Sequence, residues 1–181
     1  TNIKRMLAFS SISHAGYLLI AVIAKSSLSG SSLLFYMLSY AFTTFGAFGI
    51  IILLGRKGEE NLELENYSGL AYKHPLMALS MTVFLLSLGG LPPFAGFVAK
   101  FYIFSAAIEE GFVTLVIIAV LNSAISFYYY LKVVVFMYMK EPAGEFQISL
   151  TPMTLFVVIL GLIGTIQLGI FPDTIISLTT H

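Results

Sequence analysis

The sequence predicts an all-α membrane protein with about five transmembrane helices, one of them broken, and three observations support this prediction. Of the 181 residues, 58% are apolar or aromatic and only 10% are charged, with a mean hydropathy of +0.95. A soluble domain of this length does not need so large an apolar fraction to build its core. The apolar residues also gather in long segments, which at roughly 20 residues per crossing supply about five helices. The longest segment has glycines and prolines at its centre, which predicts the break.

The charge balance and the missing residue types exclude several classes of protein. Nine Lys and Arg balance nine Asp and Glu without a basic or acidic block, which argues against a nucleic-acid partner. There is no cysteine, hence no disulfide, thiolate metal ligand or cysteine nucleophile. No hydrolase, metalloprotease or nucleotide-binding motif is present. We therefore expect a chain that contacts the lipid bilayer and has no catalytic residue, no metal site and no nucleic-acid site.

The predicted helices cover residues 6–24, 33–54, 76–107, 112–139 and 153–171, so that residues 1–181 form one transmembrane region. The opening, Thr1 to Arg5, has the composition of a linker at a membrane surface, so we expect another helix before it. The longest connection, residues 55–75, carries seven charged side chains and is predicted to be a solvated loop with a turn at the membrane surface.

The positions of the basic residues predict how the chain is oriented in the membrane. With five crossings, only Lys25 falls on one side of the bilayer. The other side receives six basic residues, which are Lys4, Arg5, Arg56, Lys57, Lys73 and Lys140. Because basic residues are enriched in cytoplasmic loops, the N-terminus of the chain is expected to be cytoplasmic and the C-terminus to lie outside.

The third segment is too long to be one straight spanning helix. Its 32 residues would make a helix of about 48 Å, against a hydrocarbon core of about 30 Å. Residues 89–96 interrupt it, and the residues that favour a break there are Gly89, Gly90, Pro92, Pro93 and Gly96. We expect two half-helices joined inside the membrane, with a simple proline kink as the alternative. Unpaired backbone at that depth is tolerated only in a packed interior or beside a water-filled cavity, so the break points to one of these.

Lys100 follows the predicted break by four residues. An ammonium group within the bilayer costs about 2.5–3.5 kcal/mol on insertion scales, so such residues usually face a cavity and have a function. A lysine at this depth could load and release a proton. The alternative is a structural lysine, whose ammonium pairs with the backbone carbonyls that the break sets free.

Other polar side chains of the predicted helices could extend a proton path. His14 shares a helix face with Ser10 and Tyr17, and its imidazole could relay a proton or be a buried structural donor. Hydroxyl and amide groups at helical spacing could line hydrated space or join helices to one another. Those selected as a supporting path are Tyr36, Tyr40, Thr44, Asn122 and Ser126. Lys132 could carry protons or anchor its helix at the membrane surface, and the sequence leaves both open.

Four stretches of the sequence stand out together: Lys4 to Tyr17, Ser87 to Phe97, Lys100 to Tyr102 and Tyr128 to Lys132. In their order and spacing they resemble the antiporter-like subunits of respiratory complex I, the bacterial NADH-quinone oxidoreductase. Tyr36 and Tyr40 stand where the L type of this family usually has paired histidines, and the chain stops at His181 without a long lateral helix, which favours the N type, the relative of mitochondrial subunit 2. The family has fourteen helices with two inverted repeats, and this chain resembles helices ten to fourteen.

This resemblance implies a proton-translocating subunit of a redox-driven pump in a bacterial inner membrane. Lys100 matches the family's lysine or glutamate that follows the break, and the other essential charged residues of the family lie on earlier helices. No cofactor is expected in this chain, because NADH, FMN, iron–sulfur clusters and quinone would be bound by partner membrane and peripheral subunits. Two alternatives remain at this point: a subunit of a cation/proton antiporter or membrane-bound hydrogenase with the same fold, and a purely structural membrane scaffold.

Overall fold

The computed structural model describes residues 2–54, 63–142, 148 and 151–173, and in this part of the chain every regular element is helical. The elements, in chain order, are α1 (Ile3–Ala24), α2 (Ser29–Leu53), the short 3-10 helix η1 (Leu64–Tyr67), α3 (Leu70–Lys73), α4 (Pro75–Gly89), α5 (Ala95–Glu109), α6 (Val113–Met139) and α7 (Pro152–Ile170). Four of them, α1, α2, α6 and α7, are long and apolar enough to cross a membrane.

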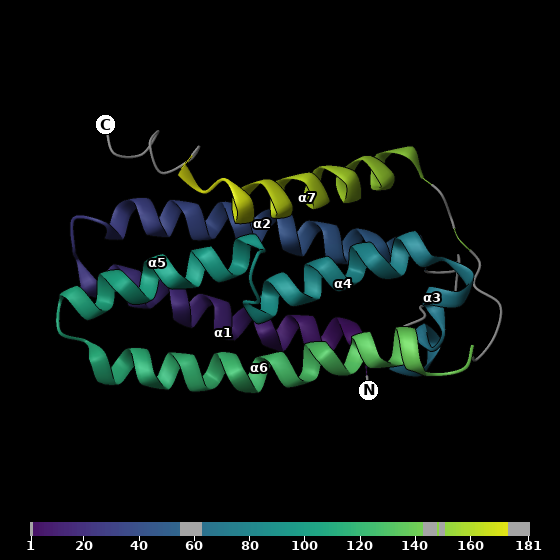
Figure 1. The fold of residues 1–181 in the computed structure, drawn as a ribbon, viewed down its shortest axis with the longest axis horizontal. Coiled ribbons are helices and arrows are strands. Elements are labelled where there is room, and N and C mark those ends of the chain that lie inside the picture. Colours follow the sequence, from purple (N-terminus) through teal and green to yellow (C-terminus); the bar gives the residue numbers. More distant parts are fainter. Residues whose placement is uncertain (1, 55–62, 143–147, 149–150, 174–181) are drawn as a thin grey trace.

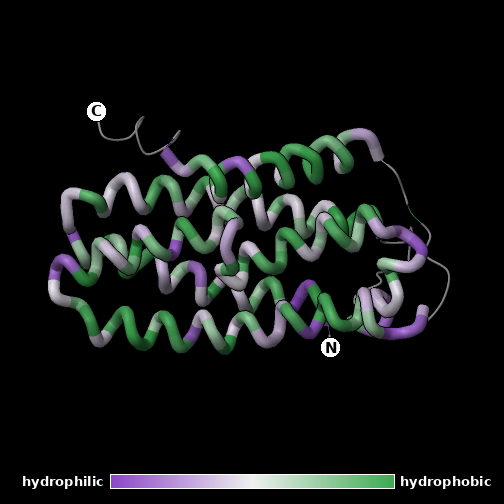
Figure 2. The backbone as a smooth tube through the Cα atoms, in the orientation of Figure 1, coloured by the Kyte–Doolittle hydropathy of each residue, from purple (hydrophilic) through white to green (hydrophobic). Residues whose placement is uncertain are grey.

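The long helices lie side by side along the longest dimension of the molecule, and α4 and α5 follow one another end to end beside them (Figure 1). The pair α4 and α5 therefore takes the place of a fifth crossing, in two halves. Apolar residues predominate along the helices, with hydrophilic ones at the ends of the bundle and fewer along its middle (Figure 2). This arrangement confirms the predicted all-α membrane fold with one broken helix.

Two helices begin earlier than hydropathy indicated. α1 begins at Ile3 because the side chain of Asn2 caps it, accepting a hydrogen bond of 2.9 Å from the backbone N–H of Arg5. α2 begins at Ser29, since its first turn is rich in serine and hydropathy does not register a polar first turn. Ser29 itself closes the preceding turn, where its Oγ accepts a 2.9 Å hydrogen bond from the backbone N–H of Ser26.

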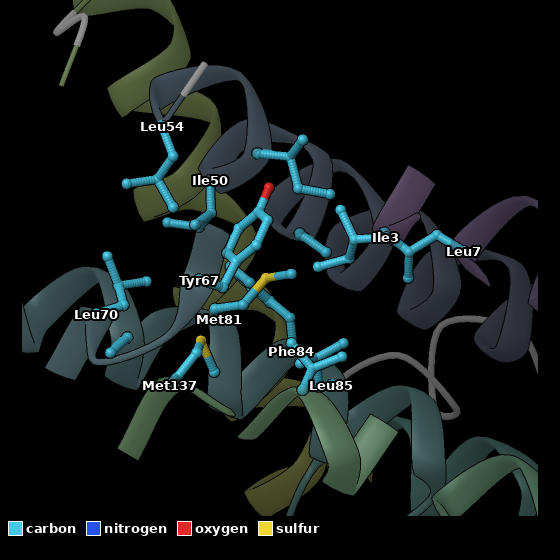
Figure 3. Packing of buried hydrophobic residues seen from close by; sticks show 14 of the residues in the cluster. Ile3, Leu7, Ile50, Leu54, Tyr67, Leu70, Met81, Phe84, Leu85 and Met137 are labelled. Carbon is cyan, nitrogen blue, oxygen red and sulfur yellow. The ribbon is translucent and has the colours of Figure 1, made fainter. Parts of the chain in front are cut away.

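The connection between α2 and α4 differs from the solvated loop that its charges predicted. Residues 55–62 lie outside the described part, but Leu64, Tyr67 and Leu70 are 4%, 1% and 0% exposed. The ring of Tyr67 packs between α2 and α4 against Ile50 and Met81 (Figure 3). The apolar residues recur every third position, and this spacing places them on one face of two short helical turns while Glu65 and Lys73 remain exposed. The connection is therefore anchored to the end of the bundle.

The half-helix α5 lies at the centre of the bundle, where it contacts α1, α2, α4, α6 and α7. Because of this position, a polar side chain on α5 can be buried. The outer faces of the bundle remain apolar, with exposed side chains that include Phe9, Ile12, Phe45, Ile125 and Phe156. An apolar outer surface of this kind suits lipid tails or further transmembrane helices.

Candidate functional site

The break between α4 and α5 begins with a glycine cap. Gly90 follows the last residue of α4 in the left-handed region, with φ +85°, which glycine adopts without strain. Its backbone N–H donates to the carbonyl oxygens of Leu86 and Ser87, at 3.0 and 2.9 Å. The cap therefore satisfies two of the four carbonyls that the end of a helix leaves without intrahelical donors.

The other two carbonyls lose their donors to the prolines. In a continuous helix, the carbonyl of Leu88 would accept from the residue four places on, which is Pro92, and that of Gly89 would accept from Pro93. Proline has no backbone N–H, so neither bond can form. The bond between Pro92 and Pro93 is cis. The two carbonyls are left as hydrogen-bond acceptors at the C-terminal, partially negative end of α4.

The ammonium group of Lys100 binds these two carbonyls. Lys100 Nζ donates to the carbonyl oxygens of Leu88 and Gly89, at 3.0 and 3.1 Å, and to the hydroxyl of Ser123 on α6, at 2.8 Å. The Lys100 side chain is 4% exposed, and its Nζ lies 5.1 Å from the centre of the Tyr17 ring on α1. The cation is thus held by helix-end carbonyls, a hydroxyl and an aromatic face, all of which favour positive charge.

A cluster of hydroxyl groups holds the two half-helices together. The backbone N–H of Gly96, in the first turn of α5, donates to Ser87 Oγ of α4 at 3.0 Å. The hydroxyl of Thr43 on α2 lies 3.3 Å from those of Ser87 and of Thr165 on α7. Gly96 allows this approach, because a Cβ there would collide with the carbonyl oxygen of Ser87. Four elements therefore meet in one polar contact at the break.

A second polar group surrounds His14 on α1, which is 5% exposed. Its Nδ1 lies 2.6 Å from the hydroxyl of Tyr36 on α2, and its Nε2 lies 3.5 Å from that of Tyr130 on α6, at the outer limit of a hydrogen bond. The ring stacks on Tyr40, with 4.6 Å between ring centres. An imidazole with a hydroxyl at each nitrogen can accept a proton on one side and donate one on the other.

A small cavity connects Lys100 with the His14 group. It offers about 10 Å³ to the centre of a water-sized sphere, close to the space that one water molecule needs. Its walls come from α1, α2, α4 and α5, and the polar residues that line it are His14, Tyr36, Ser39, Tyr40, Thr43, Ser87 and Lys100. A single water molecule in this cavity would have several hydrogen-bonding partners, as a stable buried water requires.

A larger cavity lies between α5 and α6. It measures about 500 Å³ on the same scale, is open to the surface and is lined mainly by apolar side chains. Its polar lining consists of Lys100, Ser105 and Ser123, among aromatic residues such as Phe101 and Phe104. Lys100 therefore lines both cavities, one small and polar and one large and apolar.

The structure brings most of the residues selected from the sequence to this region. Lys100, His14, Tyr36 and Tyr40 line the small cavity together. Asn122 lies on α6 and donates to the hydroxyl of Tyr17 at 3.1 Å.

Three of the selected residues do not line the small cavity. The hydroxyl of Ser126 lies beside that of Tyr17 and donates to the carbonyl of Asn122 in its own helix. Thr44 is partly buried on α2, and its buried hydroxyl oxygen has no hydrogen-bond partner among the described residues. Lys132 is exposed on α6, and no hydrogen bond in the described part of the chain joins it to Lys100 or His14.

The sequence reasoning missed Ser123 and Thr165, whose hydroxyls contact Lys100 and Thr43. Ser123 directly follows Asn122, so a polar pair in an apolar helix was the available signal. Thr165 is a lone threonine in α7, and only the packing of α7 against α2 gives it a role.

A family model described as "NADH:quinone oxidoreductase/Mrp antiporter, TM" matches residues 1–126, well over half of the chain. The chain belongs to this family. It is also similar to NADH-quinone oxidoreductase subunit N of Trichlorobacter lovleyi, with 49% identity over 97% of this chain and 36% of the relative. Subunit N 1 of Solibacter usitatus is 45% identical over 99% of the chain and 37% of the relative. The chain thus spans little more than a third of the length of these curated relatives.

Solved structures of several complexes contain a chain with the same fold. A chain of respiratory complex I from Thermus thermophilus matches 98% of this chain with a TM-score of 0.86 and 32% identity, over 40% of its own length. A chain of an archaeal membrane-bound sulfane sulfur reductase matches 99% with a TM-score of 0.84 and 29% identity, over 36% of its length. A chain of the Mrp complex from Dietzia matches with a TM-score of 0.83 at 22% identity, which shows likeness of fold alone. Together with its apolar helices, these likenesses make the chain a membrane protein.

Proposed function

We propose that the chain is part of a proton-translocating membrane subunit of an NADH-quinone oxidoreductase, in which Lys100 is a site that loads and releases a proton. The observation that carries this proposal is the position of the Lys100 amine. It is buried, bound to the two carbonyls that the prolines free, and adjacent to a cavity of one-water size that leads to His14.

The arrangement has the parts that proton transfer requires. The carbonyl end of α4 and the Tyr17 ring stabilise the charged amine, and the cavity offers room for a water molecule that can take its proton. On the far side of the cavity, His14 and its two tyrosine partners can pass a proton on by exchanging donor and acceptor roles. Within this scheme, Asn122 supports the path by orienting Tyr17, while Lys132 is the least connected of the candidates.

The identity of the relatives favours this function over the alternatives with the same fold. Relatives at 43–49% identity are named subunit N of NADH-quinone oxidoreductase, whereas the Mrp complex chain is 22% identical. A subunit of a cation/proton antiporter or of a membrane-bound hydrogenase remains the second candidate, favoured by the likeness to the sulfane sulfur reductase. Fold alone does not distinguish these functions.

The proposal places the redox chemistry in other subunits. NADH, FMN, iron–sulfur clusters and quinone would be bound by partner membrane and peripheral subunits of the complex. The complex would lie in the bacterial inner membrane, with the N-terminus of the chain on the cytoplasmic side and the C-terminus outside. The basic residues at one end of the bundle, such as Lys4 and Lys73, support this orientation.

The test uses the full-length protein in its assembled complex. Lys100→Ala is expected to abolish or strongly lower proton translocation in inverted membrane vesicles supplied with NADH, while the complex still assembles. Lys100→Arg separates transport from structure, because a guanidinium can bind the same carbonyls but does not release its proton. We expect assembly with Lys100→Arg and little translocation.

The exposed Lys140, at the end of α6, provides the matched control. Lys140→Ala should translocate protons like the unaltered protein. Normal proton translocation by an assembled Lys100→Ala complex would refute the proposal. If Lys100→Ala fails to assemble and Lys100→Arg translocates protons fully, the role of Lys100 is that of a structural scaffold. Copurification with NADH-driven quinone reduction supports complex I, whereas sodium-dependent exchange without redox activity supports the antiporter.

A further inference from the structure

We propose that Ser123 is a positioning residue that keeps the amine of Lys100 fully hydrogen-bonded both with its proton and without it. The inference rests on the proposed function, since it matters only if Lys100 changes its protonation state. Ser123 lies on α6, and its hydroxyl touches both Lys100 and the carbonyl of Gly89.

The charged state uses every donor of the ammonium group. A protonated lysine has three N–H donors and no acceptor. Lys100 places them on the carbonyls of Leu88 and Gly89 and on Ser123 Oγ, at 3.0, 3.1 and 2.8 Å. Ser123 accepts from the ammonium, and its own O–H donates to the carbonyl of Gly89 at 3.3 Å. These distances fit the loaded state, in which each of the three N–H groups has an acceptor.

The unloaded state needs one partner to change its role. When Lys100 releases a proton, one N–H bond breaks, the electron pair stays on Nζ and the proton passes to an acceptor in the adjoining cavity. The neutral amine then has two N–H donors and one lone pair, which needs a donor. Carbonyl oxygens of Leu88 and Gly89 can only accept, so they keep the two N–H groups. The Ser123 hydroxyl can rotate from Gly89 to the lone pair of Nζ, with no bond broken in the hydroxyl itself.

No other hydrogen-bond partner of Lys100 in the described residues can reverse its role in this way. The titratable groups around Lys100 are His14 and Tyr17 of α1 and Tyr36 and Tyr40 of α2. Tyr130 of α6 contacts His14. Tyr17 presents its ring to the ammonium. The helices α4 and α7, which also pack against α5, carry no titratable side chain at all. The hydroxyl of Ser123 is therefore the partner that adapts to both states.

The surroundings of Ser123 make the test feasible. Ser123 lines the cavity of about 500 Å³ between α5 and α6, so an added methyl group has room. Ser123→Thr keeps the hydroxyl, whereas Ser123→Ala removes it with almost no change in volume. Ser105 lines the same cavity from α5 and has no hydrogen bond to Lys100, so Ser105→Ala is the matched control.

The experiment measures NADH-driven proton translocation per assembled complex in inverted membrane vesicles, over a range of pH. Losing a hydrogen bond to a charged group changes an equilibrium or rate constant by a factor of about ten or more. We expect Ser123→Ala to translocate about tenfold more slowly and with a displaced pH profile. Ser123→Thr and Ser105→Ala should retain the rate and the profile of the unaltered complex.

Two outcomes would overturn the inference. If Ser123→Ala translocates like the unaltered complex while Lys100→Ala does not, Ser123 has no such role and the proposed function survives. If Ser123→Thr is as slow as Ser123→Ala, the loss comes from the shape of the side chain rather than from its hydroxyl. Normal translocation by Lys100→Ala is a separate result, because it removes the proposed function and this inference together.

Discussion

The Nδ1 atom of His14 lies 2.6 Å from the hydroxyl oxygen of Tyr36, and the two side chains are 5% and 2% exposed. This short contact joins α1 to α2 within the bundle, away from bulk water. A buried polar group that loses its partner keeps the full cost of its removal from water, about 1–3 kcal/mol. The pair is therefore a sensitive point for both the stability of the bundle and proton transfer along it.

Replacing Tyr36 by phenylalanine removes this hydroxyl and keeps the ring. We expect Tyr36→Phe to lower the free energy of unfolding by about 1–3 kcal/mol, because the His14 nitrogen loses its partner. Proton translocation should fall as well. Thermal unfolding of the detergent-solubilised protein and pumping in vesicles measure the two effects. Tyr40→Phe is the comparison, because Tyr40 contacts His14 through its ring and phenylalanine keeps that ring. It should therefore lower the free energy of unfolding less than Tyr36→Phe does. Equal losses from both variants would contradict the role of the hydrogen bond.

Gly96→Ala tests the close approach of the half-helices. A Cβ at this position would collide with the carbonyl oxygen of Ser87, which belongs to backbone and cannot turn aside. Overpacking of this kind costs about 1–3 kcal/mol or more. We expect a lower melting temperature and less assembled complex. Gly30→Ala is the control, because a Cβ there meets nothing within 4 Å. A Gly96→Ala protein as stable as this control would mean that the two half-helices can separate freely.

Tyr67→Phe is expected to stabilise the bundle. The Tyr67 hydroxyl is buried without a hydrogen-bond partner in the described residues, at the end of the bundle outside the long helices. Its removal should raise the free energy of unfolding by about 1 kcal/mol. Thermal unfolding in detergent gives the answer, and a large loss of stability would reveal a partner for the hydroxyl in the complete protein.

The same variant should change the response to alkaline pH. Burial raises the pKa of Tyr67 above its ordinary value of about 10. A group whose pKa is raised by folding contributes stability below its unfolded pKa and loses it as the pH rises through the folded value. The stability of the unaltered protein should therefore decline above about pH 10 more than that of Tyr67→Phe. Parallel declines of the two proteins would contradict this.

Lys132 and Lys100 should respond differently to loss of charge. Lys132 is exposed and has no contact with the small cavity, whereas Lys100 lines it. We expect Lys132→Met to retain most of the proton translocation and Lys100→Met to lose most of it, in vesicles with equal amounts of assembled complex. Equal losses would place Lys132 on the proton path.

The break of the third predicted helix could be predicted from the sequence because it depends on local features, namely the length of the segment and its two prolines. A helix of that length does not fit the bilayer, and Pro92 and Pro93 remove the backbone donors of two carbonyls wherever the rest of the protein lies. A lysine one turn later was therefore a clear candidate. The family resemblance then supplied the same residue independently.

The partners of Lys100 and Thr43 depend on how the helices are rotated against one another, which the sequence alone does not give. Thr43 and Thr44 are the same residue type, yet a step of about 100° along the helix separates them. Thr43 has two hydroxyl neighbours, whereas Thr44 has no hydrogen-bond partner among the described residues. Ser123 likewise meets Lys100 only because α6 packs beside the break. In the connection 64–73, abundant charge concealed the apolar spacing of Leu64 and Tyr67.

The carbonyls of Leu88 and Gly89 also determine which chemical group can occupy position 100. Both present lone pairs to the amine, and the negative end of α4 lies behind them. An ionised carboxylate in the same place would face oxygen atoms that repel it, so Lys100→Glu would have to be protonated or the break would have to open. As this chain is packed, the break therefore favours a side chain that is positive when it holds its proton and neutral when it has released it. The sign of the charge at this site therefore depends on the backbone carbonyls of Leu88 and Gly89, which the two prolines leave free.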